Sequence, residues 1–325
     1  MSKRLLLACL LVVGMISSAY AEDESALELV SKVGEDLLED YARPLIASYG
    51  VAMGTGLYNS AASHKFLGFD VGLRVMAIKI PTEAKTFTAV VKVCSLNTKF
   101  GRIDTFQDTI TAATIFGKRG IDTTWIPPNA IGIPPGMPGG LGLNYMPFLV
   151  PQAAVGLPVP GMELMVRYVP WPFKGELVHF LGLGLQQNLS AVTGVGFADI
   201  ALQGFLQKFI IGDAMNATTF GGNLHLSKTF LTLTPYAGIG FDNTSMKIKY
   251  DFKVKAPKFV PGVPPRMETE EVTIPVDFDY SSGINWRTTL GARVKLGLMF
   301  LNLDYNRDLT NSYDAFSLGT GISIR

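Results

Sequence analysis

The sequence is poor in the residues that build metal centres and redox sites. It contains only 2 cysteines and 3 histidines among 325 residues. Cys9 lies in an apolar N-terminal run described below, so removal of that run would leave Cys94 without an intrachain disulfide partner. His64, His179 and His225 are far apart in the sequence. We therefore expect no transition-metal cluster and no cofactor.

Catalytic and nucleotide-binding motifs are also missing. No Gly-x-Ser-x-Gly elbow is present, and His225 and Ser227, which share one face of an expected strand, have no marked third partner for a hydrolytic triad. The Gly-x-Gly pairs, such as Gly238 and Gly240, never extend to Gly-x-Gly-x-x-Gly. The sequence therefore predicts a protein that is not an enzyme.

An excess of charge and long uncharged runs are lacking as well. Lys and Arg total 28 against 27 for Asp and Glu, a balance that argues against a nucleic-acid partner. After the N-terminal run, no stretch approaches the roughly 20 apolar residues of a membrane-spanning helix. Charged residues make up 17% of the chain, against about 25% in soluble domains. A membrane β-barrel fits this shortage because its lipid-facing positions cannot be charged.

The N-terminus has the pattern of an export signal. Lys3 and Arg4 precede the apolar run Leu5 to Ile16, and the segment ending in Ala19-Tyr20-Ala21 forms an A-x-A cleavage site. We expect cleavage after Ala21. Lipoprotein processing at Cys9 is the alternative, but it would leave too short an apolar region.

Alternation of apolar and polar residues is abundant. In residues 246–254, apolar side chains take every second place and Lys247, Lys249, Asp251 and Lys253 fill all the others, so one strand face would meet lipid and the other the lumen. The same alternation predicts the strands Tyr49–Asn59, Phe66–Ile80, Val150–Leu157, Met162–Val169, Glu176–Ser190, Asp199–Ile211, Asp213–Ser227, Thr229–Phe241, Thr244–Val254, one ending near Lys295, Leu298–Arg307 and Tyr313–Arg325.

These strands predict an all-β fold, a transmembrane antiparallel β-barrel of about 12–14 strands in the bacterial outer membrane. A soluble periplasmic β-sandwich is the structural alternative. Its strands would be shorter, about 5–6 residues, and its solvent face richer in charge.

The expected organisation is a signal peptide (1–21), an N-terminal helical segment (22–47) and a barrel (48–325). The amphipathic pattern of Glu24–Tyr41 predicts a periplasmic or lumen-capping helix that ends at Pro44. Residues 82–149 form a long irregular insert, rich in proline and glycine, which suggests a loop or a lumen plug. Strand parity favours the periplasm or the lumen for this insert.

Two sets of side chains are candidate site residues. The first is expected to line the lumen, either as salt bridges that stiffen the barrel or as a polar conduit with weak anion preference: Asp70, Arg74, Glu163, Arg167, Lys247, Lys249, Asp251, Lys253, Arg287, Arg293, Lys295 and Asp304. The second is expected to form aromatic girdles at the membrane interfaces: Trp171, Tyr236, Tyr250, Trp286, Tyr305 and Tyr313.

Several segments carry a family resemblance: 67–73 (LGFDVGL), 138–143 (PGGLGL), 155–170 and 233–240 (LTPYAGIG). In these the chain resembles an uncharacterised family of outer-membrane barrels from Gram-negative bacteria, which implies fold and location but no activity. The helix before the first strand is also loosely similar to long-chain fatty-acid transporter barrels. The chain ends in Ile324-Arg325, whereas many such barrels end on an aromatic residue.

Three functions remain open from the sequence. The first is a passive channel or transporter for small solutes, including hydrophobic ones. The second is a non-conducting structural or secretion-accessory barrel that docks partner proteins, and the third is a soluble periplasmic binding protein. For the first two, the expected partners are outer-membrane lipid, the barrel assembly machinery and an unidentified small solute, with no nucleic acid.

Overall fold

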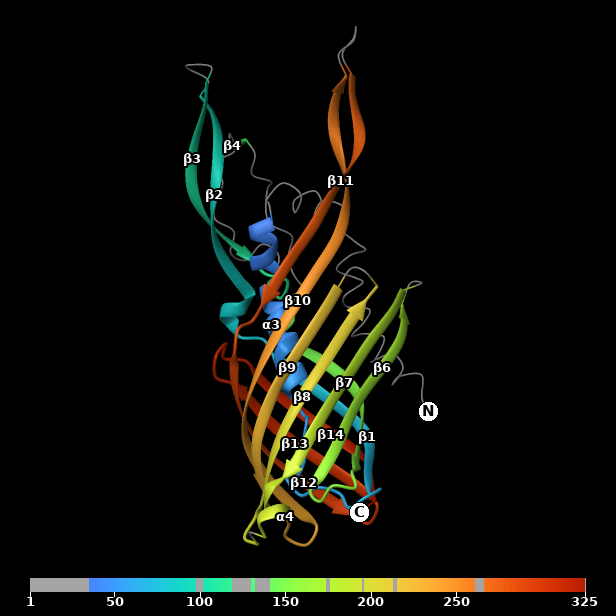
Figure 1. Cartoon of the computed structure of the whole chain (residues 1–325). Helices are drawn as coiled ribbons and strands as arrows, with labels where there is room; N and C mark the ends of the chain where they lie inside the picture. Colours follow the sequence, from blue (N-terminus) through green and yellow to red (C-terminus); the bar gives the residue numbers. More distant parts are fainter. Residues whose placement is uncertain are drawn as a thin grey trace.

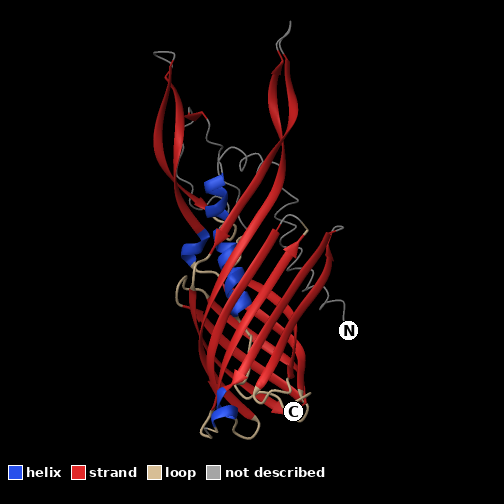
Figure 2. Cartoon of the chain, in the orientation of Figure 1, coloured by secondary structure: helices blue, strands red, loops and turns tan. Residues whose placement is uncertain are grey.

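The computed structural model describes residues 35–97, 102–118, 130–131, 141–173, 176–194, 196–212, 215–260 and 266–324. A closed antiparallel barrel of 10 strands dominates the fold (Figures 1 and 2). In order around the wall these strands are β10 (Leu233–Val260), β12 (Asn285–Leu296), β13 (Met299–Asp308), β14 (Asp314–Ile324), β1 (Phe69–Lys79), β5 (Tyr145–Gly156), β6 (Met162–Phe173), β7 (Glu176–Asn188), β8 (Asp199–Ile211) and β9 (Met215–Ser227). Pairing of β9 with β10 closes the ring.

The wall is apolar outside and mostly polar inside. On β13, Met299, Leu301 and Leu303 are exposed, while Asn302 and Asp304 between them are buried. Side chains alternate between the two faces of a strand, so this pattern turns rows of leucine outward around the barrel. A soluble barrel would not expose such rows to water. The exterior is therefore that of a membrane barrel, and a soluble binding protein is not supported.

The two ends of the barrel differ. At one end, where β14 finishes and β1 begins, the strands are joined by short turns, one of which contains the helix α4 (Leu189–Thr193). At the other end two hairpins project beyond the wall (Figure 1). One joins β2 (Thr86–Asn97) to β3 (Arg102–Ala113), with the short β4 (Ala130–Ile131) on β2, and follows the 3-10 turn η1 (Thr82–Lys85). The other joins the far half of β10 to β11 (Arg266–Ser281). We call these the short-turn end and the hairpin end.

The helix α3 (Glu35–Gly54) descends from the hairpin end into the barrel (Figures 1 and 2). Pro44 lies inside it, so the expectation that Pro44 ends the helix is wrong. The expected strand Tyr49–Asn59 is also wrong, because α3 extends to Gly54. A helix satisfies its own backbone hydrogen bonds, whereas a lone strand inside a lumen would leave both edges unpaired. Among the described residues no helix is long and apolar enough to cross a bilayer.

The strand count is lower than expected for two reasons. Tyr49–Asn59 contributes no strand, and the segments Thr229–Phe241 and Thr244–Val254 belong largely to one strand, β10, of 28 residues. The loss of the first strand also changes the side of the insert. Residues 82–118 and 141–144 follow β1 and precede β5, so they lie at the hairpin end, opposite the end of β14. Residues 119–129 and 132–140 of the insert lie outside the described residues.

The side-chain directions expected for residues 246–254 are inverted where the structure describes them. Met246 is buried inside the barrel, whereas Lys247 and Lys249 are exposed on the outer face. Here β10 leaves the wall for the hairpin with β11, and Lys247 forms an ion pair with Asp279 at 3.1 Å. Outside the membrane the apolar face packs inward and the charged face meets water, as in a soluble sheet.

Candidate functional site

The interior is filled by α3 and by the segment that follows it, residues 55–64. We call these residues, 35–64, the plug. Around the plug the wall has two zones, an apolar one toward the hairpin end and a polar one toward the short-turn end. The zones follow from the strands themselves, because inward positions of β1 change from Asp70 and Arg74 to Met76 and Ile78 along the chain.

The apolar zone holds the middle of α3. Ile46, Ala52 and Met53 are almost fully buried in this zone. The ring centre of Tyr49 lies 5.5 Å from that of Phe209. The surrounding wall residues come from β1, β5, β7, β9, β10 and β14: Met76, Ile78, Val150, Phe180, Ala217, Met246 and Ala315. Burying a large apolar side chain stabilises by about 1.5–3 kcal/mol. Burial in this zone therefore stabilises the closed position of the helix in the barrel.

The end of α3 carries unpaired carbonyl groups and no basic residue in its last turn. The wall supplies what the helix lacks. Arg167, fully buried on β6, donates to the carbonyls of Met53 at 3.4 Å and Thr55 at 2.9 Å, and Gln207 on β8 donates to Met53 at 2.6 Å. A cation at a helix C-terminus also interacts favourably with the helix dipole.

The chain beyond the helix is bound in the same way. Gln152 and Gln203 donate to the carbonyl of Leu57 at 3.4 and 3.5 Å, and Gln186 donates to that of Ser60 at 3.4 Å. The hydroxyl of Ser227 accepts from the backbone N–H of Ala61 at 2.9 Å. Side chains from β5, β7, β8 and β9 thus bind the plug backbone without using a strand edge.

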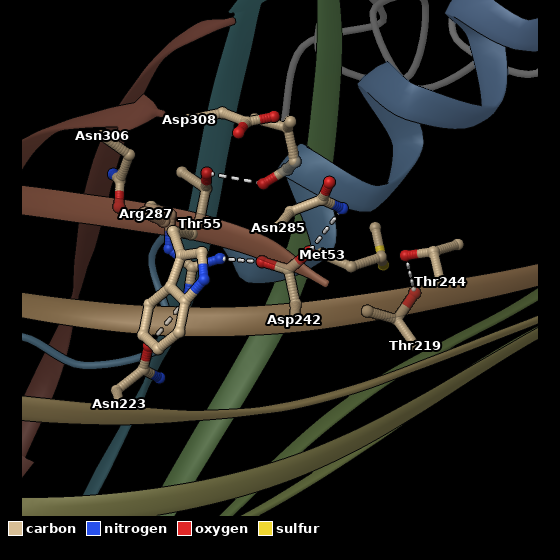
Figure 3. A network of polar contacts seen from close by, with 12 residues as sticks. Met53, Thr55, Thr219, Asn223, Asp242, Thr244, Asn285, Arg287, Asn306 and Asp308 are labelled. Carbon is tan, nitrogen blue, oxygen red and sulfur yellow. Dashed lines mark hydrogen bonds and ion pairs between the residues drawn. The ribbon is translucent and has the colours of Figure 1, made fainter. Parts of the chain in front are cut away.

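Two glycines let α3 lie against the wall. A methyl group at Gly54 would collide with the guanidinium of Arg287 and approach a carboxylate oxygen of Asp242 to 3.0 Å. A methyl group at Gly50, one turn earlier, would lie 2.8 Å from the hydroxyl of Thr244. Figure 3 shows Arg287 between Asp242 and Asn223, with hydrogen bonds of 2.5 and 2.8 Å. This buried pair occupies the place that a side chain at residue 54 would need.

At the short-turn end the plug finishes in a charged cluster. The imidazole of His64 lies 2.6 Å from Glu163 on β6 and 2.9 Å from Asp70 on β1. Arg293 on β12 pairs with Asp70 at 3.0 Å and donates to Asn59 at 2.8 Å. The cluster joins the last part of the plug to three strands of the wall. Burial lowers the pKa of His64, but hydrogen bonds to Asp70 and Glu163 and their charges outweigh it and raise the pKa to about 9.

This pKa predicts how stability depends on pH. Folding favours protonated His64, so its contribution is complete below the unfolded pKa of about 6.5 and is lost as pH rises through about 9. The full shift corresponds to about 3 kcal/mol. Urea unfolding in detergent micelles between pH 6 and 10 should show this loss in the native chain and a flatter profile in His64→Gln. Equal profiles would contradict the charged state of His64.

The structure brings most candidate lumen residues together inside the wall. The candidates that point inward are Asp70, Arg74, Glu163, Arg167, Arg287, Arg293 and Asp304. Lys295 also points inward, and its ammonium donates to Ser323 at 3.2 Å. Lys247 and Lys249 instead lie on the outer face beyond the wall, and the side chains of Asp251 and Lys253 lie outside the described residues.

The aromatic candidates divide between the two faces. Trp286 and Tyr305 lie on the outer face, where their rings contact Phe241 and Phe316. Tyr236 and Tyr313 are buried inside the barrel, so their assignment to a girdle is wrong. Tyr236 takes an inward position of β10 and donates to Asp304 at 3.0 Å. The side chains of Trp171 and Tyr250 lie outside the described residues.

The glutamines that bind the plug were not among the residues predicted from the sequence. Gln152, Gln186, Gln203 and Gln207 occupy inward positions on β5, β7 and β8. Glutamine carries both a donor and an acceptor, so a row of such residues on neighbouring strands signals a buried backbone to be bound.

Within the part of the chain that the structure describes, no group of three or more His, Cys, Asp or Glu could hold a metal ion.

Comparison with known proteins gives a family and loose structural likeness. Solved structures similar to the chain include Ail of Yersinia pestis (5% identity, 80% of this chain and 98% of that one, TM-score 0.21) and the outer membrane channel DcaP of Acinetobacter baumannii (10%, 81% and 100%, 0.20). A FadL homologue of Pseudomonas aeruginosa is also similar (9%, 84% and 96%, 0.23). TM-scores this low carry no argument about activity. No curated protein matches the sequence. The model of DUF6588, a family of unknown function, matches residues 1–324, and the chain therefore belongs to this family.

Proposed function

We propose that this protein is an outer-membrane barrel that is closed at rest and conducts small solutes only when its plug moves. The observation that carries the proposal is the binding of the plug backbone by Arg167, Gln207 and the other lumen side chains. A continuously open diffusion channel does not fit a lumen filled in this way.

Polar binding of the plug supports movement rather than a permanent seal. A typical intramolecular hydrogen bond contributes only about 0.5–1.5 kcal/mol net, because the same groups bond to water when separated. The inward face that plug withdrawal would hydrate carries both signs of charge, including Arg74, Arg293 and Asp304. Such a face accepts water readily. The proposal includes no catalytic activity and no cofactor, and it names the barrel assembly machinery as the partner for insertion.

A reversible lock tests this function. An ideal Cβ at Gly50 lies 3.4 Å from the Cβ of Thr244, close to the about 3.5–4.5 Å of a disulfide. Gly50→Cys with Thr244→Cys, in a Cys9→Ser, Cys94→Ser background, should therefore tie the plug to β10. In planar bilayers we expect voltage- or urea-induced openings of the reduced protein and none after oxidation. The Thr244→Cys single variant is the matched control and should open in both states.

Two other results would reject gated conduction. Steady conductance in the oxidised form would show a path that bypasses the plug, as in a passive channel. Silence in both forms, with folding verified by heat-dependent gel mobility, would favour a non-conducting barrel.

The two projecting hairpins support that second function, the docking of partner proteins. Twelve residues on each strand of β2–β3, at about 3.3 Å per residue, reach roughly 40 Å. Both hairpins rise from the hairpin end, so one partner could contact both (Figure 1). Shortening each hairpin to its first pairs should leave the barrel folded and abolish capture of that partner.

A further inference from the structure

The short-turn end of the barrel exposes large apolar side chains on neighbouring turns. Between β9 and β10, Phe230 is 54% and Leu231 is 100% exposed; between β7 and β8, Val192 is 66% and Phe197 is 78% exposed. We call these four residues the turn patch. Lys228 lies among them, with its ammonium 4.2 Å from the ring centre of Phe197 and 5.6 Å from that of Phe230.

Leu231 has an unfavourable backbone conformation. Its φ of 55° lies in the left-handed region, which an L-residue with a bulky side chain rarely adopts. Glycine or asparagine would adopt this turn more easily. A fully exposed leucine there gains nothing from the protein interior. Its position beside three other exposed apolar side chains points to an apolar environment outside the chain.

The height of the apolar belt on the outer face of β8 and β9 indicates which environment the turn patch contacts. On β9 the outward residues from Phe220 to Leu226 contain no charge, and the next outward residue toward the hairpin end is the polar Thr218. Thr218 is paired with Lys208, which is exposed on β8. Six residue steps cover about 20 Å of strand, or about 15 Å along the barrel axis at the usual tilt. Membrane barrels carry an apolar belt about 25 Å tall.

The belt is therefore about 10 Å short on β8 and β9, and the exposed apolar turns beyond Ile200 and Leu226 would extend it. The turn patch is continuous with this belt, since Ile200, Leu226 and Leu233 next to it are all exposed on the outer face. Lys228 suits the same position, because a lysine stem lies along apolar surface while its ammonium reaches the phosphate level.

We propose that the turn patch is buried in the lipid leaflet at the short-turn end, with the Lys228 ammonium paired to a phospholipid phosphate. The occupant of this surface is lipid, not a second protein. The proposal rests on membrane insertion of the barrel, which the proposed function also requires, but not on whether the plug moves.

Depth-dependent quenching tests the proposal. In a full-length Cys9→Ser, Cys94→Ser background, single cysteines replace Leu231, Leu224 or Glu83 and carry an environment-sensitive fluorophore. Leu224 is an exposed residue within the apolar outward stretch of β9 and serves as the lipid reference. Glu83 is exposed in η1 at the hairpin end and serves as the aqueous reference. The proteins are refolded into phosphatidylethanolamine–phosphatidylglycerol vesicles and quenched by nitroxide on the lipid chain or by iodide in water.

We expect the ratio of lipid to aqueous quenching at Leu231→Cys to lie within about twofold of that at Leu224→Cys, as interfacial burial requires. Iodide quenching of Leu231→Cys to the level of Glu83→Cys, with Leu224→Cys still in lipid, would overturn the turn-patch proposal alone. Protection of Leu231→Cys from both quenchers would also overturn it, because protein would then cover the patch. Aqueous quenching at all three sites would reject membrane insertion, and with it both proposals.

Lys228→Gln separates the phosphate contact from the apolar one. The fluorophore at Leu231→Cys should move toward water by a larger amount in Lys228→Gln than in Lys228→Arg, which keeps the charge. Equal positions in both variants would remove the phosphate pairing from the proposal.

Discussion

Gly54→Leu should lower the free energy of unfolding by about 3–5 kcal/mol. Its side chain would occupy the place of the Arg287 guanidinium and force either the helix away from β10 or the buried Arg287–Asp242 pair apart. Overpacking costs about 1–3 kcal/mol, and breaking a buried ion pair costs about 3–5 kcal/mol. Urea unfolding in micelles, followed by heat-dependent gel mobility, measures the loss.

Gly204→Leu is the matched control for this substitution. Gly204 is exposed on the outer face of β8. A Cβ at this position would meet nothing within 4 Å. We expect its free energy of unfolding to stay within about 0.5 kcal/mol of that of the native chain. Equal losses in the two variants would attribute the effect to glycine in general and not to contact between α3 and the wall.

Alternation predicted the wall well because one physical rule governs every strand in it. A residue such as Leu303 must face lipid and its neighbour Asp304 must face the interior, so a period of two is enforced along the strand. The rule fails where lipid ends. At Met246 and Lys247 the same alternation has the opposite orientation, because water surrounds that part of β10 and the plug lies inside it.

A helix that caps the lumen was predicted, but the second part of the plug was predicted as a strand, because its sequence satisfies two patterns at once. Residues 49–59 contain Val51, Met53 and Leu57 at alternate positions, which also suits a strand, and Pro44 suggests a helix end. Only the surrounding wall decides between the two. It covers α3 with apolar residues on several sides, and Arg167 and Gln207 from distant parts of the chain bind its last carbonyls.

Arg167→Met should release the second half of the plug while the wall remains folded. The substitution keeps an unbranched side chain but removes the donors to Thr55 and Gln152, which leaves one buried and one partly buried acceptor without these bonds. Each such acceptor costs about 1–3 kcal/mol. Hydrogen exchange followed by mass spectrometry should show amides of residues 55–64 exchanging at least about tenfold faster, since 1.4 kcal/mol corresponds to a factor of ten.

Two further variants separate this effect from loss of an arginine as such. Arg307→Met removes a partly exposed arginine that pairs with Asp314 at 2.7 Å, and a surface pair contributes about 0–1 kcal/mol. It should leave exchange in the plug unchanged. Arg167→Lys keeps the charge at the end of α3 but not the forked donors, so it should fall between the native chain and Arg167→Met.

The place of faster exchange decides whether the plug is a separate unit. Faster exchange confined to residues 55–64, with more frequent openings of Arg167→Met in planar bilayers, is what a movable plug requires. If β1 and β14 lose protection together with the plug, then plug and wall unfold as one body, and gated conduction loses its physical basis. Arg167 would in that case stabilise a sealed barrel, and the projecting hairpins would be the remaining place for function.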